Sequence, residues 1–285
     1  MALIPPFFFD CVVAIGERAV DKHISFTATG FLYGKLVIKG ESAETNQYRV
    51  YLITNRHVFE GRDAVVLRFN TLGGAPAKIY DVSLKDNLGQ VIYFLHPDPE
   101  IDIAVVSINV QLLQQEGILF GFFHSDKHVL PLQKATGVGV AEGEGIFLLG
   151  FPMGDAGKDQ NFVIARQGAI ARIRDAIAGK SKHFLIDAAI FPGNSGGPVV
   201  TKPEIVSIQG TQAHSEANLI GIVAGYIPFQ DIAISVQTKR PRIIFEENSG
   251  LGVVFSIEDI TAVVERADLK QVCDTTRDIR KDGAA

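Results

Sequence analysis

Short apolar segments rich in Val, Ile, Phe, Tyr and Thr recur along this chain of 285 residues, and turn residues separate them at short intervals. Such segments are typical of β-strands. A first series covers residues 11–15, 25–38, 48–54, 64–69, 90–95 and 103–110, and a second covers residues 145–151, 161–173, 183–190, 197–200, 219–227 and 251–257. Because no long helices alternate with them, the segments favour antiparallel barrels or sandwiches over a parallel α/β sheet.

The more mixed stretch 111–135 separates the two series and is a plausible linker. We therefore expect one barrel over about 10–110 and a second over about 136–257. A helix is predicted over 257–268, because Ser256 is a suitable N-cap with Asp259 three residues later, followed by apolar residues at helical spacing. Residues 269–285 are polar, and we expect a fraying tail.

The composition supports a packed core and limits the classes of partner. Apolar residues make up 47% and charged residues 21%, and the net charge of −5 argues against a general nucleic-acid surface. Basic clusters at 172–182 and 238–242 are interpreted as solvated loops. Two cysteines, Cys11 and Cys273, do not make a disulfide framework and suit a reducing compartment.

The N-terminal residues "MALIPPFFFD" lack a basic region and contain Pro5 and Pro6, so we expect no secretory signal. No apolar run approaches the roughly 20 residues that span a bilayer; residues 219–229 are among the longest. The sequence thus predicts a soluble, cytoplasmic protein without membrane contact.

The stretch "FPGNSGGPVV" carries the most specific chemical signal. Glycines in a sheet-like region usually mark a bulge, a tight turn or a close backbone approach. Gly193 lets the chain turn so that the N–H groups of the loop, Gly193 and Ser195 with Asn194 between them, converge on one point. Gly196 and Gly197 then keep side chains away from the serine. These glycines are interpreted as building an oxyanion hole around a nucleophilic Ser195.

Two further residues complete a possible catalytic triad. "TNRHV" places His57 just past a strand end, and "DIAVV" places Asp102 at the start of an apolar strand. Each alone is a weak signal, since a lone histidine after a strand is more often structural. A serine hydroxyl, however, needs a histidine to take its proton and a carboxylate to hold that histidine in the correct tautomer. Together, His57, Asp102 and Ser195 satisfy that requirement.

The letters "GNSGG" also match G-x-S-x-G, the nucleophile elbow of α/β-hydrolases. That fold needs a helix directly after the serine and the chain order serine, acid, histidine. Here Pro198 and two valines follow, which indicates a strand, and His214 is the only later histidine. An esterase of that type would depend on His214 instead of His57. The order His, Asp, Ser favours the chymotrypsin arrangement.

The three motifs resemble those of chymotrypsin-fold serine proteases, specifically the HtrA-like (high-temperature-requirement) branch. The similarity spans roughly residues 10–268 and includes "ATGFLYG", "GFPMG", "LIGIVAG" and "GLGVVFSIEDITAVV". The resemblance implies an all-β fold of two six-stranded antiparallel barrels with a short C-terminal helix. It places the active site between the barrels, with His57 as general base, Asp102 orienting it and Ser195 forming an acyl-enzyme.

Several departures from this pattern change the expectations. Val58 and Phe191 stand where secreted relatives carry disulfide cysteines. Asn194 replaces the aspartate that pairs with a newly freed N-terminus in zymogen-type relatives, so activation by such cleavage is not expected. Too few residues follow 268 for the PDZ domain that HtrA-like relatives often carry, which puts PDZ-mediated regulation in doubt.

The resemblance also locates a substrate pocket, formed by Ala189, Ile190, Val223, Ala224 and Gly225. Small, neutral Ala189 at its base predicts a preference for small to medium aliphatic side chains. The strand 223–225 would pair with the substrate backbone by strand addition. Residues 228–250 look like a long insertion near this cleft, a candidate for selectivity or regulation.

We set two other motifs aside. His124 and His128 are four residues apart, but they lack the glutamate of a zinc protease motif, and "GDAGKD" fails the spacing of a phosphate loop. No metal and no cofactor is expected. The sequence predicts a serine endopeptidase acting on protein or peptide substrates; the alternative is a latent or inactive module of the same fold that binds proteins and needs an activating partner.

Overall fold

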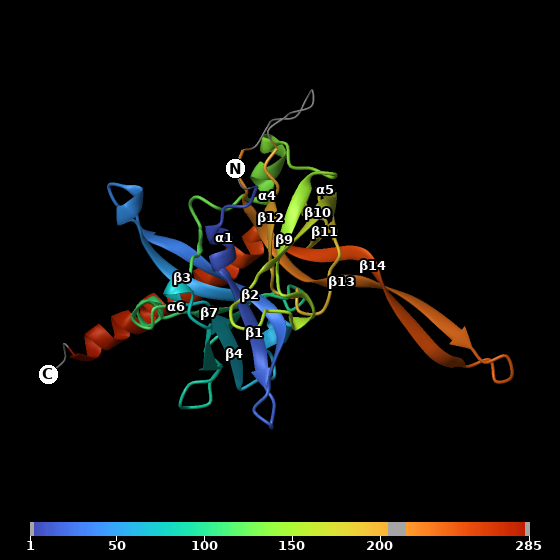
Figure 1. The fold of residues 1–285 in the computed structure, drawn as a ribbon. Helices are drawn as coiled ribbons and strands as arrows, with labels where there is room; N and C mark the ends of the chain where they lie inside the picture. The colour runs from blue at the N-terminus through green and yellow to red at the C-terminus, as the bar shows by residue number, and fades with distance from the viewer. Residues whose placement is uncertain (1–2, 205–214, 283–285) are drawn as a thin grey trace.

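The computed structural model of the protein describes residues 3–204 and 215–282, and two β-sheets packed against each other form its body (Figure 1). The first sheet follows the order β5-β4-β1-β2-β3-β7-β6, and β8 pairs in parallel with β2. Its strands are β1 (Val12–Arg18), β2 (Ile24–Ile38), β3 (Gln47–Thr54), β4 (Ala64–Phe69), β5 (Lys78–Ser83), β6 (Phe94–Leu95), β7 (Ala104–Ser107) and β8 (Phe123–His124).

The second sheet closes into a six-stranded antiparallel barrel in the order β10-β11-β14-β13-β12-β9. Its strands are β9 (Gly145–Gly150), β10 (Ile164–Arg172), β11 (Phe184–Asp187), β12 (Pro198–Thr201), β13 (Leu219–Ile234) and β14 (Pro241–Ser256). Short helices α1 (Phe7–Asp10), α2 (Arg56–Phe59), α3 (Val110–Gln115), α4 (Leu132–Ala135) and α5 (Arg174–Ile177) occupy the connections.

The predicted all-β, chymotrypsin-like class is confirmed, with two differences in detail. The first sheet has eight strands and stays open between β5 and β6, where the pairing is limited to an isolated Lys85–Val91 bridge and the neighbouring bond from the Ile92 N–H to the Leu84 carbonyl at 3.0 Å. This opening follows from the turn-rich sequence between residues 84 and 93, which supports no longer ladder. The stretch 111–135 is more than a linker, because it contributes β8 and α4.

Three apolar clusters hold the body together. One consists of side chains from the first sheet and its connections, and another fills the interior of the closed barrel. The third joins the two sheets and includes Tyr51 and Ile103 from the first, Ile222 and Phe255 from the second, and one face of the C-terminal helix. The junction between the sheets is therefore a packed interior, which fixes the positions of the loops at its edge.

The C-terminal helix α6 (Ile257–Asp282) begins with the predicted cap. Ser256 Oγ accepts the Asp259 N–H at 3.3 Å, and Asp259 Oδ2 accepts the Ser256 N–H at 3.0 Å, a reciprocal capping box. The helix extends well past residue 268, where a polar tail was predicted. Its buried residues Ile260, Val263 and Val264 recur at helical spacing and pack into the third cluster.

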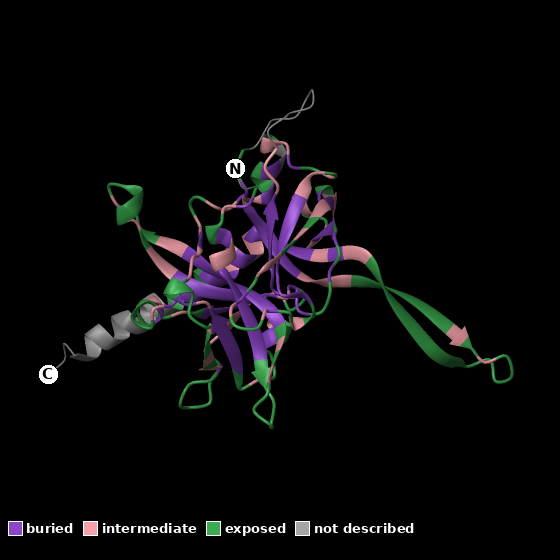
Figure 2. Ribbon diagram, viewed as in Figure 1, coloured by how far each residue is buried: buried purple, intermediate pink, exposed green. Residues whose placement is uncertain are grey.

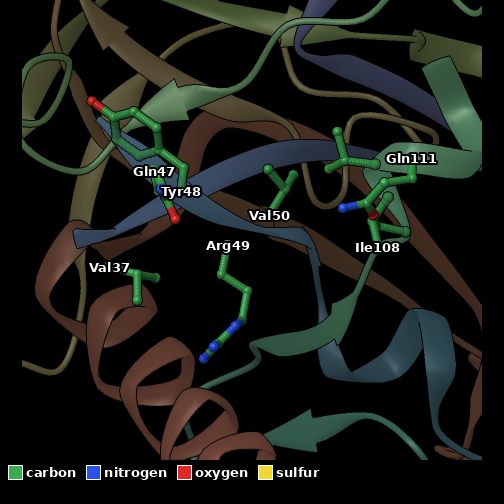
Figure 3. A pocket seen from close by; sticks show the side chains of 8 residues that line it. Val37, Gln47, Tyr48, Arg49, Val50, Ile108 and Gln111 are labelled. Carbon is green, nitrogen blue, oxygen red and sulfur yellow. The ribbon is translucent and has the colours of Figure 1, made fainter. Parts of the chain in front are cut away.

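A charged contact attaches α6 to the first sheet. Asp268 accepts hydrogen bonds from Lys35 Nζ at 2.9 Å and from Tyr51 Oη at 3.1 Å, and it also pairs with Arg49. Figure 3 shows Arg49 pointing toward α6 beside a cavity of about 260 Å³ along β3. Burial favours the neutral acid, but Lys35 and Arg49 outweigh it and lower the pKa of the Asp268 carboxyl. This helix is thus held by both packing and charge.

Strands β13 and β14 continue beyond the barrel as a long two-stranded ribbon. They pair from Pro228↔Asn248 out to Ile234↔Pro241, and the ribbon projects far from the body (Figure 1). The insertion expected over 228–250 is therefore a regular hairpin. Within the described part of the chain, no helix is both long and apolar enough to cross a membrane.

Candidate active site

His57 lies where the first sheet meets α2. Strand β3 ends at Thr54, and α2 begins two residues later, so that His57 sits in its first turn. Phe59 is fully buried in the core of the first sheet and anchors the helix. The His57 side chain remains 53% exposed, which leaves the imidazole accessible to a substrate.

Asp102 contacts His57 through both of its carboxylate oxygens. Its Oδ2 lies 2.6 Å from His57 Nδ1, and its Oδ1 accepts the His57 N–H at 3.0 Å. Asn55 Nδ2 also donates to the Asp102 carbonyl at 2.7 Å. The pairing of Thr54 with Ala104 sets β3 and β7 in this register, and buried Ile103 fixes the segment. A carboxylate at Nδ1 leaves the lone pair of neutral His57 on Nε2.

Ser195 lies in the loop between β11 and β12. The backbone conformation of this loop requires glycine at two positions. Gly193 has φ +96°, and a Cβ there would overlap the carbonyl oxygen of Phe151. Gly196 has φ +85°, and a Cβ there would overlap the carbonyl oxygen of Thr29. Any other residue would meet both conformational strain and a collision. These constraints account for the glycines that flank Ser195.

Thr29 of β2 ties this loop to the first sheet. Its Oγ1 donates to the Gly193 carbonyl at 2.7 Å and accepts the Phe151 N–H at 3.1 Å. Its own N–H donates to the Ser195 carbonyl at 2.9 Å, and the side chain is fully buried. Thr54 Oγ1 in turn donates to the Thr29 carbonyl at 2.8 Å. Thr29 therefore sets the loop relative to the end of β3, two residues before α2.

Two backbone N–H groups of the loop are available to an oxyanion. Among the described residues, the N–H groups of Gly193 and Ser195 have no protein acceptor, whereas the Asn194 N–H donates to the Phe191 carbonyl at 3.0 Å. Asn194 Oδ1 accepts the Phe191 N–H at 3.0 Å, and the residue is buried. Asn194, predicted as part of the oxyanion hole, thus braces the turn that presents the other two groups.

The Ser195 hydroxyl is engaged with the neighbouring strand. Its Oγ donates to the Ala224 carbonyl of β13 at 3.1 Å. Ser195 and His57 are both among the described residues, and no hydrogen bond joins them. The loop is held on β13 by the Gly196 N–H, which donates to the Val223 carbonyl at 2.9 Å. A rotation about the Ser195 Cα–Cβ bond would move the hydroxyl away from the Ala224 carbonyl.

The residues predicted for the substrate pocket divide into two groups. The side chains of Ile190 and Val223 lie in the core of the closed barrel. Ala189 is exposed, and Ala224 and Gly225 are partly exposed on β13. The solvent-accessible wall of this region is therefore formed by Ala189 together with Ala224 and Gly225 of β13.

Arg166 stands behind this wall and was not singled out from the sequence. Its Nη1 donates to the Ala189 carbonyl at 3.2 Å, and its guanidinium carbon lies 5.0 Å from the centroid of the Phe191 ring. It points into the barrel, since its register partner on β9, Leu148, is fully buried. A cation thus stacks on the loop next to Ser195.

The motifs set aside remain outside this site. Strand β12 begins at Pro198, so a strand follows the serine as expected, and His214 lies outside the described residues. His124 and His128 lie in an aromatic cluster, with their rings 4.7 Å apart. In residues 3–204 and 215–282, the structure contains no cluster of three or more His, Cys, Asp or Glu side chains able to hold a metal. Cys11 is a buried free thiol, and burial raises its pKa well above the ordinary value.

Comparison with known proteins identifies the family of this chain. The model of a family described as "Trypsin-like peptidase domain" matches residues 28–204, more than half of the chain. The chain belongs to the trypsin-like peptidase family. It is similar to a probable periplasmic serine endoprotease, DegP-like, of Brucella suis, with 26% identity over 174 residues. It is also similar to the serine protease Do-like HtrA of Bacillus subtilis, with 29% identity over 194 residues. The predicted HtrA-like relationship is thereby confirmed.

These matches cover 60% and 65% of this trypsin-like peptidase chain, but only 27% and 35% of the two relatives. The chain thus spans about a third of the length of the curated relatives that it matches. Among solved structures, the MamO protease domain of Magnetospirillum magneticum in its apo form is similar, with a TM-score of 0.48 and 16% identity. That comparison covers 90% of this chain and 97% of the other.

Proposed function

We propose that this protein is a serine endopeptidase that cleaves peptide bonds through an acyl-enzyme on Ser195. The observation that carries the proposal is the pairing of Asp102 with His57 together with two N–H groups beside Ser195 that have no acceptor among the described residues. A base held in one tautomer and a preorganised anion site are the two requirements of acyl transfer by a serine.

In the first half of the reaction, Ser195 Oγ attacks the substrate carbonyl while its proton passes to His57 Nε2. The negative charge that develops on the carbonyl oxygen is stabilised by the N–H groups of Gly193 and Ser195. The C–N bond then breaks, and the proton on Nε2 moves to the departing amine. A water molecule repeats these steps on the ester, giving its proton to Nε2 and releasing the acid and free Ser195.

The resting contact of Ser195 with Ala224 has a role in this scheme. A substrate strand added along β13 would offer its own N–H to the Ala224 carbonyl, which now accepts the serine hydroxyl at 3.1 Å. Substrate binding would therefore release the hydroxyl and let it turn to His57. The Ser195 proton and the substrate N–H compete for one acceptor, so correct backbone docking and activation of the nucleophile are coupled.

For the substrate side chain next to the scissile bond we propose a small to medium aliphatic residue. Ala189, Ala224 and Gly225 supply small, uncharged groups at the accessible wall. Arg166 behind Ala189 adds a positive charge, which disfavours Lys or Arg in that position. A peptide library varied only at this residue should give cleavage after Ala, Val or Leu and little after Lys or Arg.

Hydrolysis of unfolded casein tests the proposed activity. We expect cleavage by the wild-type chain and a loss of at least about 10³-fold on Ser195→Ala or His57→Ala. Ser107→Ala, at an exposed strand end, is the matched control and should cleave as the wild type does. Cleavage should persist in EDTA. Equal activity in Ser195→Ala would exclude this serine as the nucleophile.

One observation favours a latent form as the second candidate. Because the Ser195 hydroxyl donates to Ala224 at rest, a partner or peptide that binds β13 could be required before hydrolysis begins. A latent enzyme would cleave a short reporter peptide only after a second, uncleavable peptide is added. A constitutive enzyme would cleave the reporter peptide at the same rate with and without the second peptide.

A further inference from the structure

The ribbon that β13 and β14 form beyond the barrel, residues 227–249, is called the arm here. Figure 2 shows it almost entirely exposed, far from the cores that hold the two sheets. A two-stranded ribbon without a covering layer is marginally stable in water. An arm of this length therefore raises the question of what covers it.

The middle of the arm is apolar on both faces. Ile232 pairs with Ile244, and Ala233 pairs with Ile243, so these two pairs face opposite sides. Six large apolar side chains of the arm are each 53% to 61% exposed: Phe229, Ile232, Ile234, Ile243, Ile244 and Phe245. Because these side chains are divided between the two faces, each face presents its own exposed apolar patch, and exposed patches of this kind mark interaction surfaces.

Opposite charges flank this apolar middle. The tip carries Lys239, Arg240 and Arg242, and the stem nearer the barrel carries Asp231, Glu246 and Glu247. None of these six side chains forms an ion pair within the described part of the chain. Arg242 and Glu246, four residues apart on one strand, are separated by about 13 Å at roughly 3.3 Å per residue. This is the spacing of their Cα atoms along the strand.

We propose that the arm binds the arm of a second copy of this chain, antiparallel and related by a two-fold axis. A two-fold contact must be self-complementary, and the arm meets that condition. The basic tip of each copy lies on the acidic stem of the other, and the Ile232–Ile244 pairs of both copies meet at the axis. This inference concerns assembly and does not depend on the proposed catalytic activity.

Charge reversal at one end of the arm gives a specific test. The tip variant carries K239E, R240E and R242E, and the stem variant carries D231K, E246K and E247K. Each variant brings like charges together at both contacts of a homodimer. In an equimolar mixture, however, the acidic tip of the tip variant meets the basic stem of the stem variant. At the second contact, the basic tip of the stem variant meets the acidic stem of the tip variant, so both contacts are attractive.

Mass measurement by light scattering after gel filtration should give a dimer for the wild type and a monomer for each variant. The mixture should restore a dimer that contains one copy of each, detected with a tag on one variant. The chain carrying all six substitutions should also dimerise. Unchanged melting temperatures of the variants would show that the body is intact, since the arm extends beyond the closed barrel.

A wild type that remains monomeric at about 100 µM would overturn the proposal. It would also be overturned by variants that still dimerise alone, by a mixture that does not associate, or by a wild type that forms a larger ring. Ile232→Asp with Ile244→Asp provides an independent variant for the apolar middle. It should weaken dimerisation at least about tenfold, and undiminished dimerisation would contradict the antiparallel contact.

Discussion

Asp102 holds His57 from two directions, with Oδ2 at 2.6 Å from Nδ1 and Oδ1 accepting the backbone N–H of His57 at 3.0 Å. The second bond fixes the chain at α2, and the first fixes the ring. The imidazole therefore has little rotational freedom although half of its side chain is exposed. Orientation of this kind is the role of the carboxylate in a serine triad.

Asp102→Asn should lower kcat by about 10⁴-fold, because an amide nitrogen donating to Nδ1 would select the wrong tautomer. KM should change much less. Asp159→Asn, which removes an exposed carboxylate elsewhere, is the control and should leave kcat unchanged. Steady-state kinetics on a reporter peptide measure both constants. A variant at position 102 that kept full kcat would show that the carboxylate does not act through His57.

Thr29→Val should impair the oxyanion loop. The substitution removes the hydroxyl that bonds to the Gly193 carbonyl and the Phe151 N–H, leaving two buried polar groups unpaired. We expect a loss of about 1–3 kcal/mol in unfolding free energy and of about 10–100-fold in kcat. Thr29→Ser keeps the hydroxyl and should retain most of both. Equal effects of the two variants would assign Thr29 a packing role alone.

Gly193→Ala tests whether the loop needs its left-handed turn. With φ +96° and the Phe151 carbonyl in the way, the variant must move the N–H of residue 193. We expect kcat to fall by about 10²-fold or more. Gly117→Ala has a comparable positive φ and open space around it, so it isolates the conformational cost. The control should be somewhat less stable and fully active.

Acid should destabilise the protein partly through His128. Burial, with His124 and Lys127 nearby, lowers the pKa of His128 to about 4 from the ordinary 6.5. The unfolded chain takes up this proton first as the pH falls below 6.5, so unfolding becomes more favourable between about pH 6.5 and 4. His128→Asn does not titrate and keeps an acceptor for the His124 N–H, which bonds to Nδ1 at 3.0 Å. Its unfolding free energy in urea should fall less from pH 7.5 to 4.5. An equal fall would exclude His128 as a source of the loss.

The candidate triad could be located from sequence because each member lies in a local pattern. Glycines at 193 and 196 indicate the turn around Ser195, and the strand ends beside His57 and Asp102 follow from apolar runs. The capping box at Ser256 is equally local. The end of α6 was placed too early because polar residues dominate after 268, and because the contact of Asp268 with distant Lys35 cannot be inferred from the local sequence.

Other features depend on contacts between residues far apart in the chain. Thr29 reaches Gly193 across 164 positions, and Arg166 reaches the Ala189 carbonyl from a neighbouring strand. Nothing in the local letters "ATGF" or "IARQG" identifies these partners. The arm was expected only as a long insertion near the cleft; its strand pairing appears only in the structure.

The most direct measurement is the mass of the intact protein after incubation with a fluorophosphonate, which reacts with activated serines. The account predicts one adduct on the wild-type chain, on the peptide that contains Ser195, and no adduct on Ser195→Ala or His57→Ala over the same time. Folded wild-type protein that stayed unmodified, or a His57→Ala variant modified as fast as the wild type, would contradict an activated serine at this site.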